Sequence, residues 1–291
     1  GRPIYSINIH FLFTDYTHLS YMIDSRSKGG GRMAIEVFNR YEKKYRINDA
    51  CYQRLRERLP EYMEADAYSR DGGLYTICNI YYDTPQNDLI RHSTEETFYK
   101  EKLRLRSYGL AAPEDKVFLE IKKKYNGLVN KRRTRLTLTE AYSFVKTGRL
   151  PEYKPYMNAQ VLNELYYLIH RMELVPAVFL SYRRAAMFGK EDKDFRITFD
   201  RDITTRRYDL GLHYGVYGEK LLPEDEWVME IKIDKAMPLW MTRLLSELHI
   251  YPASFSKYGT EYKHYLAGEA PMQREAAPTE EECRDGFERM A

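Results

Sequence analysis

Charged and apolar residues alternate with a period of two along five stretches of the chain, and Arg and Lys supply most of the charges. The stretches lie near residues 40–45, 102–106, 119–122, 196–200 and 229–233. Successive side chains of a strand point to opposite faces of a sheet, so this period predicts five strands with an ionic face. Half-exposed strands show the same alternation, but they rarely repeat Arg-x-Arg and Glu-x-Lys. A closed barrel with an ionic interior would explain all five stretches together.

Other segments predict the elements between these strands. Further strands are predicted over residues 74–84 and 175–188, and in the segment NKRRTR, which follows the hairpin signal Asn126-Gly127. Apolar spacing typical of helices runs through residues 48–65, 137–148, 158–172 and 238–248. Strands spread through the chain with helices between them favour one antiparallel β domain decorated with helices, which is an α+β fold.

Composition limits the classes of protein that the chain can represent. Residues 1–35 are expected to form an irregular lead-in to the patterned residues 36–267, and the polar residues 268–291 a disordered tail. The net charge of +3 gives no reason to expect a nucleic-acid partner. Three distant cysteines without CxxC spacing favour a cytoplasmic protein without disulfides or structural zinc. No apolar run is long enough to span a bilayer.

The ionic face is the main candidate for chemistry, because Walker A, GxGxxG, HExxH and GxSxG signatures are all missing from the sequence. Arg104 and Arg106 are two apart on one strand, so their side chains point the same way about 7 Å apart. That spacing suits neighbouring phosphates, which guanidinium groups bind bidentately. The same alternation adds further candidate phosphate-binding residues: Arg40, Lys102, Lys122, Lys131, Arg133 and Arg135. Crowded cations repel one another, so the face is expected to bind a polyanion.

Three carboxylates lie on the same basic face: Glu42, Glu120 and Glu230. Each could form salt bridges with neighbouring Arg and Lys residues. Alternatively, each could hold a hard divalent cation that also bridges phosphate oxygens. Glu230 is the best candidate metal ligand of the three.

Several motifs occur in the order and spacing of one known domain: RYEKKY, YYDT, KLRLRSYG, FLEIKKK, SYRRAAMFG, RITFDRDI, VMEIKI and FSKYGTEY. Over residues 36–266 the chain resembles the VTC domain, the polyphosphate polymerase domain of the vacuolar transporter chaperone complex. That domain belongs to the triphosphate tunnel metalloenzymes, which are relatives of the CYTH proteins. The SPX domain and transmembrane helices of the eukaryotic subunits do not occur in this sequence, so a stand-alone, bacterial-type member is expected.

The resemblance implies an eight-stranded antiparallel β-barrel that forms a triphosphate tunnel. The implied activity is transfer of the γ-phosphate of ATP, or of another nucleoside triphosphate, to a growing polyphosphate chain, with Mn²⁺ or Mg²⁺ on a glutamate. Two alternatives stay open: a tripolyphosphatase or nucleoside triphosphatase, and a non-catalytic sensor of polyphosphate or inositol phosphates. Arg40 stands at the first Glu of the ExExK signature of hydrolytic relatives, which favours the polymerase. A membrane partner protein also stays open.

The resemblance also assigns roles to individual residues. It implies Glu230 as the metal ligand and a catalytic set of basic residues: Lys44, Arg104, Arg106, Lys122, Arg184, Arg196 and Lys257. Arg184 is preferred to Arg183 because it keeps the spacing to Ala186. One basic residue of the NKRRTR strand also matches, but the pattern does not separate Lys131 from Arg133.

Overall fold

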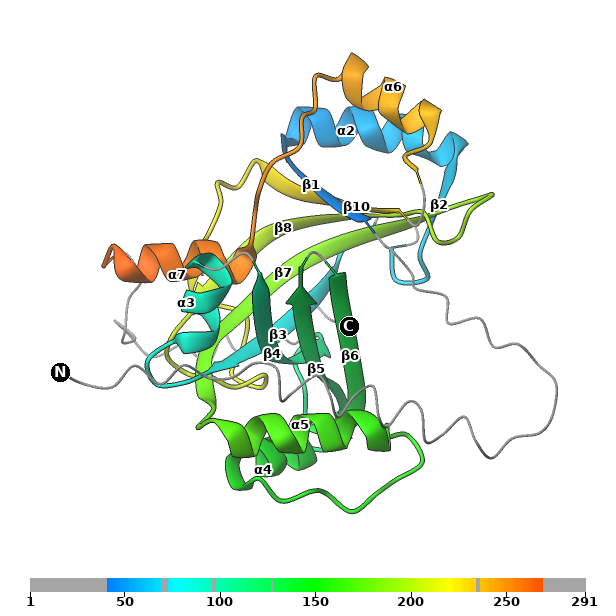
Figure 1. Cartoon of the computed structure of the whole chain (residues 1–291). Helices are drawn as coiled ribbons and strands as arrows, with labels where there is room; N and C mark the ends of the chain where they lie inside the picture. The colour runs from blue at the N-terminus through cyan, green and yellow to red at the C-terminus, as the bar shows by residue number, and fades with distance from the viewer. Residues whose placement is uncertain (1–40, 70–72, 96–97, 127, 234–235, 269–291) are drawn as a thin grey trace, which may run out of the picture. The chain divides into compact units, whose positions relative to one another are not determined.

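The computed structural model describes residues 41–69, 73–95, 98–126, 128–233 and 236–268 (Figure 1). The expected lead-in over residues 1–35, the candidate Arg40 and nearly all of the expected tail lie outside these ranges. None of the helices described is long and apolar enough to cross a membrane.

A large antiparallel sheet forms the centre of the described region. Its main path runs in the order β1-β10-β8-β7-β3-β4-β5-β6, and two short strands, β2 and β9, pair with β7 and β8. In chain order the strands are β1 Tyr41–Asn48, β2 Met63–Ala65, β3 Tyr75–Asp83, β4 Tyr99–Tyr108, β5 Lys116–Tyr125, β6 Leu128–Thr137, β7 Val175–Gly189, β8 Arg196–Arg206, β9 Glu219–Lys220 and β10 Glu226–Ile233. The predicted α+β fold with an antiparallel sheet is therefore confirmed.

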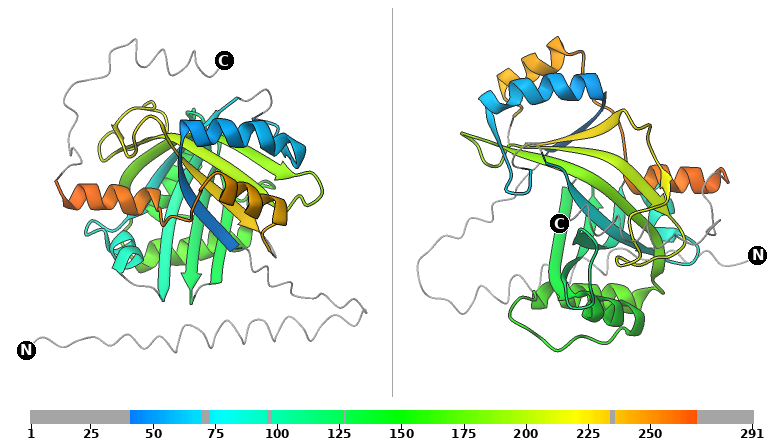
Figure 2. Two further views of the ribbon diagram at one scale, coloured as in Figure 1. Left: turned by 90° about the horizontal axis from the view of Figure 1, so that it is seen from above. Right: turned by 180° about the vertical axis from the view of Figure 1, so that it is seen from behind.

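The two ends of the main path, β1 and β6, are not hydrogen-bonded to each other in the part of the chain that the structure describes. The sheet is nevertheless strongly curved, and β1, β10 and β8 lie across the steeper strands β4 to β6 (Figures 1 and 2). Closure into an eight-stranded barrel stays a prediction.

Helices cover the sheet, and three of the six described begin and end within one residue of the bounds predicted from the sequence. Their bounds are α2 Asp49–Arg58, α3 Asp88–Glu95, α4 Leu138–Thr147, α5 Ala159–Arg171, α6 Leu239–Glu247 and α7 Lys257–Leu266. Thr137 and Glu140 form a capping box at the start of α4, and Gly148 ends that helix with φ of +70°. Asn158 caps α5 by accepting a hydrogen bond from the backbone N–H of Val161.

The predicted helix over residues 48–65 is wrong in its second half. Helix α2 ends at Arg58, Leu59–Glu61 form a 3₁₀ turn, and Met63–Ala65 pair with β7 as strand β2. Pro60 explains the change, because proline has no backbone N–H to continue the helical hydrogen bonds. Helices α3 and α7 were not predicted as helices. The Asp83 carboxylate starts α3 by accepting the N–H groups of Leu89 and Ile90.

Apolar side chains on the outer face of the sheet bind the helices. Leu103, Leu105 and Leu119 pack with α4 and α5, and Trp227 stacks on Tyr52 of α2 with ring centres 3.7 Å apart. A third apolar cluster lies on the inner face, where Tyr81 stacks on Tyr258 of α7. This inner cluster fixes α7 against the sheet, so its first residue, Lys257, lies at the boundary between the apolar cluster and the ionic face.

Candidate functional site

The register of the strands gathers the ionic residues on the inner face of the curved sheet. Residues directly opposite each other on adjacent strands share a face, and the alternation extends that face along each strand. This inner face includes the cations Lys44, Lys102, Arg104, Arg106, Lys122, Lys131, Arg133, Arg135, Arg184, Arg196, Lys232 and Lys257. It also includes the carboxylates Glu42, Glu120, Asp200 and Glu230.

Three lysines form a row across neighbouring strands. Lys102 of β4 is opposite Lys122 of β5, which is opposite Lys131 of β6. Like charges in directly opposed positions destabilise a sheet unless an anion neutralises them. Burial and neighbouring cations lower the pKa of Lys102 to about 8, and burial lowers that of Lys131 to about 7. The row is therefore built for a ligand that brings negative charge.

Glu120 is the centre of a second group, the Glu120 cluster. The carboxylate is 2% exposed, and it accepts a hydrogen bond of 2.6 Å from Nε of Arg104. Nζ of Lys131 lies 3.1 Å from it, and side-chain nitrogens of Arg106 and Arg133 each lie 3.9 Å away. Burial raises the pKa of Glu120, but Arg104, Arg106 and Lys131 outweigh burial and hold the pKa well below its ordinary value. Four cations thus share one buried carboxylate.

A third group, the Asp200 cluster, joins β7, β8, β10 and the start of α7. Asp200 is fully buried and accepts two hydrogen bonds from Arg184, at 2.6 and 2.7 Å, and one from Nζ of Lys257 at 2.6 Å. Nζ of Lys257 is also 3.5 Å from Glu230, and Nζ of Lys44 is 3.6 Å from the same carboxylate. Burial opposes ionisation of Asp200 and Glu230, yet these cations hold both pKa values below the ordinary range.

The groups form one continuous surface. Arg106 donates hydrogen bonds to Asn79 (3.0 Å) and to the hydroxyl of Tyr182 (3.1 Å), and the ring of Tyr182 lies 5.0 Å from the guanidinium carbon of Arg184. Charged side chains of β1 and β5, which are not paired with each other, also interact electrostatically. Burial and Glu230 raise the pKa of Glu42, but Lys122 and Lys44 lower it more strongly, so the net shift is downward.

The carboxylates provide a partial ligand set for a divalent cation. Glu42 and Glu230 each lie within 3.6 Å of Nζ of Lys44, and Asp200 shares Lys257 with Glu230, so these carboxylates are linked in pairs through two lysines. No group of three or more His, Cys, Asp or Glu side chains in the described residues is arranged to hold a metal alone. The donors fit Mn²⁺ or Mg²⁺ only if phosphate oxygens and water supply the remaining ligands, as Mg²⁺ usually requires.

The structure places most of the sequence-predicted residues together. Arg184 is on the inner face, whereas Arg183 is about half exposed on the other face and pairs with Asp202. Arg196 lies 4.8 Å from the ring of Phe188, opposite Lys232. Lys131 and Arg133 both contact Glu120, so both belong to the site.

Two buried residues of the site were not singled out from the sequence. Asp200 alternates with Ile197 and Phe199 in the segment RITFD, which placed it on the ionic face without revealing its partners. Tyr182 is 3% exposed and connects Arg106 with Arg184. It lies two residues before Arg184 on the same strand, and this spacing was the available signal.

Binding of a triphosphate is expected to involve proton uptake by Lys102. Its pKa is lowered from 10.5 to about 8 in the folded protein. The unfolded chain therefore holds more protons between these values, so this group's contribution to stability rises with pH in that window and is unfavourable below it. A polyanion favours the charged amine and reverses the shift. Calorimetry of tripolyphosphate binding at about pH 8.5, in two buffers of different ionisation enthalpy, counts the protons.

Lys102→Met is expected to take up fewer protons than the wild type under these conditions. Lys146→Met, which changes an exposed lysine of α4, serves as the control and is expected to match the wild type. Because the ligand's own proton exchange is common to all three proteins, only the difference between them counts. Equal uptake by Lys102→Met and the wild type would contradict the prediction.

Comparison with known proteins agrees with the resemblance inferred from the motifs. The sequence matches the VTC domain over residues 39–266, and the chain belongs to this family. A search of curated proteins found no match.

Solved structures with some similarity include putative adenylate cyclases from two bacteria. The one from Bacillus halodurans is 15% identical, with 74% of this chain and 92% of that chain covered and a TM-score of 0.46. The one from Vibrio parahaemolyticus is 16% identical, with 78% and 97% covered and a TM-score of 0.39. A Mimivirus capping enzyme triphosphatase is 12% identical, with 81% and 95% covered and a TM-score of 0.28. These similarities are too distant to assign an activity.

Proposed function

We propose that this protein is a metal-dependent polyphosphate polymerase that transfers the γ-phosphoryl group of ATP, or of another nucleoside triphosphate, to a growing polyphosphate chain. The observation that carries the proposal is the row of opposed lysines, Lys102, Lys122 and Lys131, beside the buried arginines of the same face. Lys122, Arg196 and Lys232 have no ion pair among the described residues, so the face has charge available for a bound polyanion.

The proposed reaction requires mainly positioning and charge stabilisation from the protein. A terminal phosphate oxygen of the acceptor chain forms a bond to the γ-phosphorus while the bond between that phosphorus and the β–γ bridging oxygen breaks, and ADP leaves. Arg104, Arg106 and the lysine row hold the triphosphate and stabilise charge on its oxygens. Lys44 and Lys257 flank Glu230 and orient the terminal phosphates.

A divalent cation held by Glu230, with Glu42 and Asp200 nearby, would neutralise charge on the phosphate oxygens. Asp200 keeps Arg184 and Lys257 in place through hydrogen bonds of 2.6 and 2.7 Å. The proposal includes a tunnel formed by the curved sheet. The downward effect of Lys122 of β5 on the pKa of Glu42 of β1 supports it, because it is an interaction between side chains of two strands that are not paired with each other. We also propose a cytoplasmic location, where ATP is available.

The test of the proposal is incubation of the purified protein with ATP and Mn²⁺. Polyphosphate is expected to appear on a gel, and Glu230→Gln is expected to form none because it lacks the carboxylate charge for the metal. Glu224→Gln, which changes an exposed carboxylate, is the matched control and is expected to behave as the wild type.

Three outcomes would argue against parts of the proposal. Release of orthophosphate from ATP and tripolyphosphate without polymer would identify a hydrolase. Metal-independent binding without turnover would identify a receptor. Polymer formation by Glu230→Gln at the wild-type rate would remove Glu230 as the metal ligand.

A further inference from the structure

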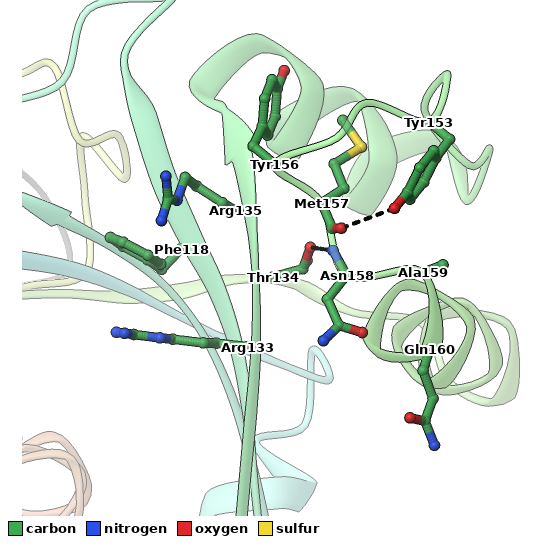
Figure 3. Close-up of a pocket in the computed structure, with 10 residues that line it drawn as sticks. All are labelled: Phe118, Arg133, Thr134, Arg135, Tyr153, Tyr156, Met157, Asn158, Ala159 and Gln160. Carbon is green, nitrogen blue, oxygen red and sulfur yellow. Dashed lines mark hydrogen bonds between the residues drawn. The ribbon is translucent and has the colours of Figure 1, made fainter.

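A pocket of about 560 Å³ lies at the end of the ionic face, beside the edge strand β6 (Figure 3). One wall is charged and comes from the inner face of the sheet. There Arg133 and Arg135 lie over the ring of Phe118, with guanidinium carbons 4.6 and 5.8 Å from its centre. Arg133 is also 3.9 Å from Glu120, so this wall continues the Glu120 cluster.

The opposite wall has no charged side chain among the lining residues. It consists of the loop before α5 and the first residues of that helix, and it presents two tyrosines and two amides: Tyr153, Tyr156, Asn158 and Gln160. Figure 3 shows these side chains on one side of β6, and Arg133 and Arg135 on the other. A ligand that contacts both walls would have an anionic end and a neutral, planar or hydrogen-bonding end.

The pocket also includes the outer edge of β6. Since β6 is the last strand of the main path, its outward peptide groups have no strand partner in the described part of the chain. Tyr153 is 59% exposed, which leaves its ring accessible for stacking. Backbone groups, side-chain amides and an aromatic ring together are the usual means of holding a nucleobase, whereas a polyphosphate would need cations on both walls.

We propose that this pocket binds the nucleoside of a nucleoside triphosphate whose phosphates lie on the ionic face. Tyr153 stacks on the base, Gln160 hydrogen-bonds to its edge, and Arg133 and Arg135 contact the phosphate nearest the sugar. The inference rests on the proposed function, and it names the nucleoside as the part of the substrate that this pocket selects.

The experiment compares tripolyphosphate, which has no nucleoside, with the β,γ-imido analogue of ATP, which has one. Tyr153→Ala combined with Gln160→Ala is expected to weaken binding of the ATP analogue about tenfold, as loss of one stacked base typically does. Its affinity for tripolyphosphate is expected to stay within about twofold of the wild type. Tyr167→Ala removes a tyrosine of α5 that is 75% exposed outside the pocket, and it is the matched control for both ligands.

Tyr153 donates a hydrogen bond to the carbonyl of Met157, so replacing Tyr153 could also disturb the loop. Gln160 is exposed, so Gln160→Ala alone tests the pocket without that effect. If this variant binds the ATP analogue more weakly but binds tripolyphosphate as the wild type does, the result supports the proposed nucleoside site. Equal effects on both ligands, or none on either, would overturn the inference. The proposed function would still stand if the wild type binds tripolyphosphate. Failure of the wild type to bind tripolyphosphate would remove the proposed function and the inference with it.

Discussion

Replacing Asp200 with alanine is expected to reduce the free energy of unfolding by about 3–5 kcal/mol and to weaken binding of tripolyphosphate. Asp200 is fully buried and compensates two cations at once, Arg184 and Lys257, which are themselves only 9% and 11% exposed in their side chains. Without the carboxylate, both cations lose their closest counter-ion. The side chains would reorient toward water and lose their places at the site.

Denaturant unfolding measures the stability loss, and calorimetry with tripolyphosphate measures binding. Asp200→Asn keeps the shape of the side chain but removes its charge. It is expected to show most of the stability loss of Asp200→Ala, because the amide cannot offset two cations. The control is Glu224→Ala, which breaks an exposed pair with Lys220 and is expected to leave the stability close to that of the wild type. An Asp200→Ala protein with wild-type stability would show that Arg184 and Lys257 do not depend on this carboxylate.

The period of two was sufficient to predict which residues share the ionic face. Arg104 and Arg106 lie on that face, and Leu103 and Leu105 are buried on the other, because backbone geometry alone sets the alternation. The capped helices α4 and α5 were equally predictable, since their caps are local. Tyr258, Tyr262 and Tyr265 recur at helical spacing in α7, and this signal was not used.

Partners on neighbouring strands could not be predicted in the same way. Glu120 and Glu230 occur in the same Glu-x-Lys pattern, so the sequence offered metal binding and salt bridging for both. The order of the strands places Glu120 between β4 and β6, among four cations, and Glu230 next to β1 and α7, beside two lysines. Strand order depends on contacts between residues far apart in the chain, and a local pattern contains no information about them.

This difference leads to a second large effect, for Glu120→Gln. Removing the carboxylate charge leaves Arg104, Arg106, Lys131 and Arg133 to repel one another, and the free energy of unfolding is expected to fall by about 3 kcal/mol. The expected loss is at the lower end of the range given for Asp200→Ala, because Lys131 and Arg133 are partly exposed and can turn toward water. Tripolyphosphate is expected to bind this variant more tightly than the wild type, since the ligand then supplies the missing negative charge.

Thermal unfolding with and without tripolyphosphate measures both effects, because a ligand that binds only the folded state at 100 times its Kd adds about 2.7 kcal/mol. The matched control is Glu101→Gln, which changes a buried carboxylate of β4 on the opposite face, where Arg171 and Lys123 pair with it. That variant is expected to lose stability as well, but its ligand-induced shift should equal that of the wild type. A smaller shift for Glu120→Gln than for the wild type, recovered by raising Mn²⁺, would instead assign Glu120 to the metal. The four cations around its carboxylate favour the first result, because a metal ion there would add a fifth positive charge to a cluster that contains one negative charge.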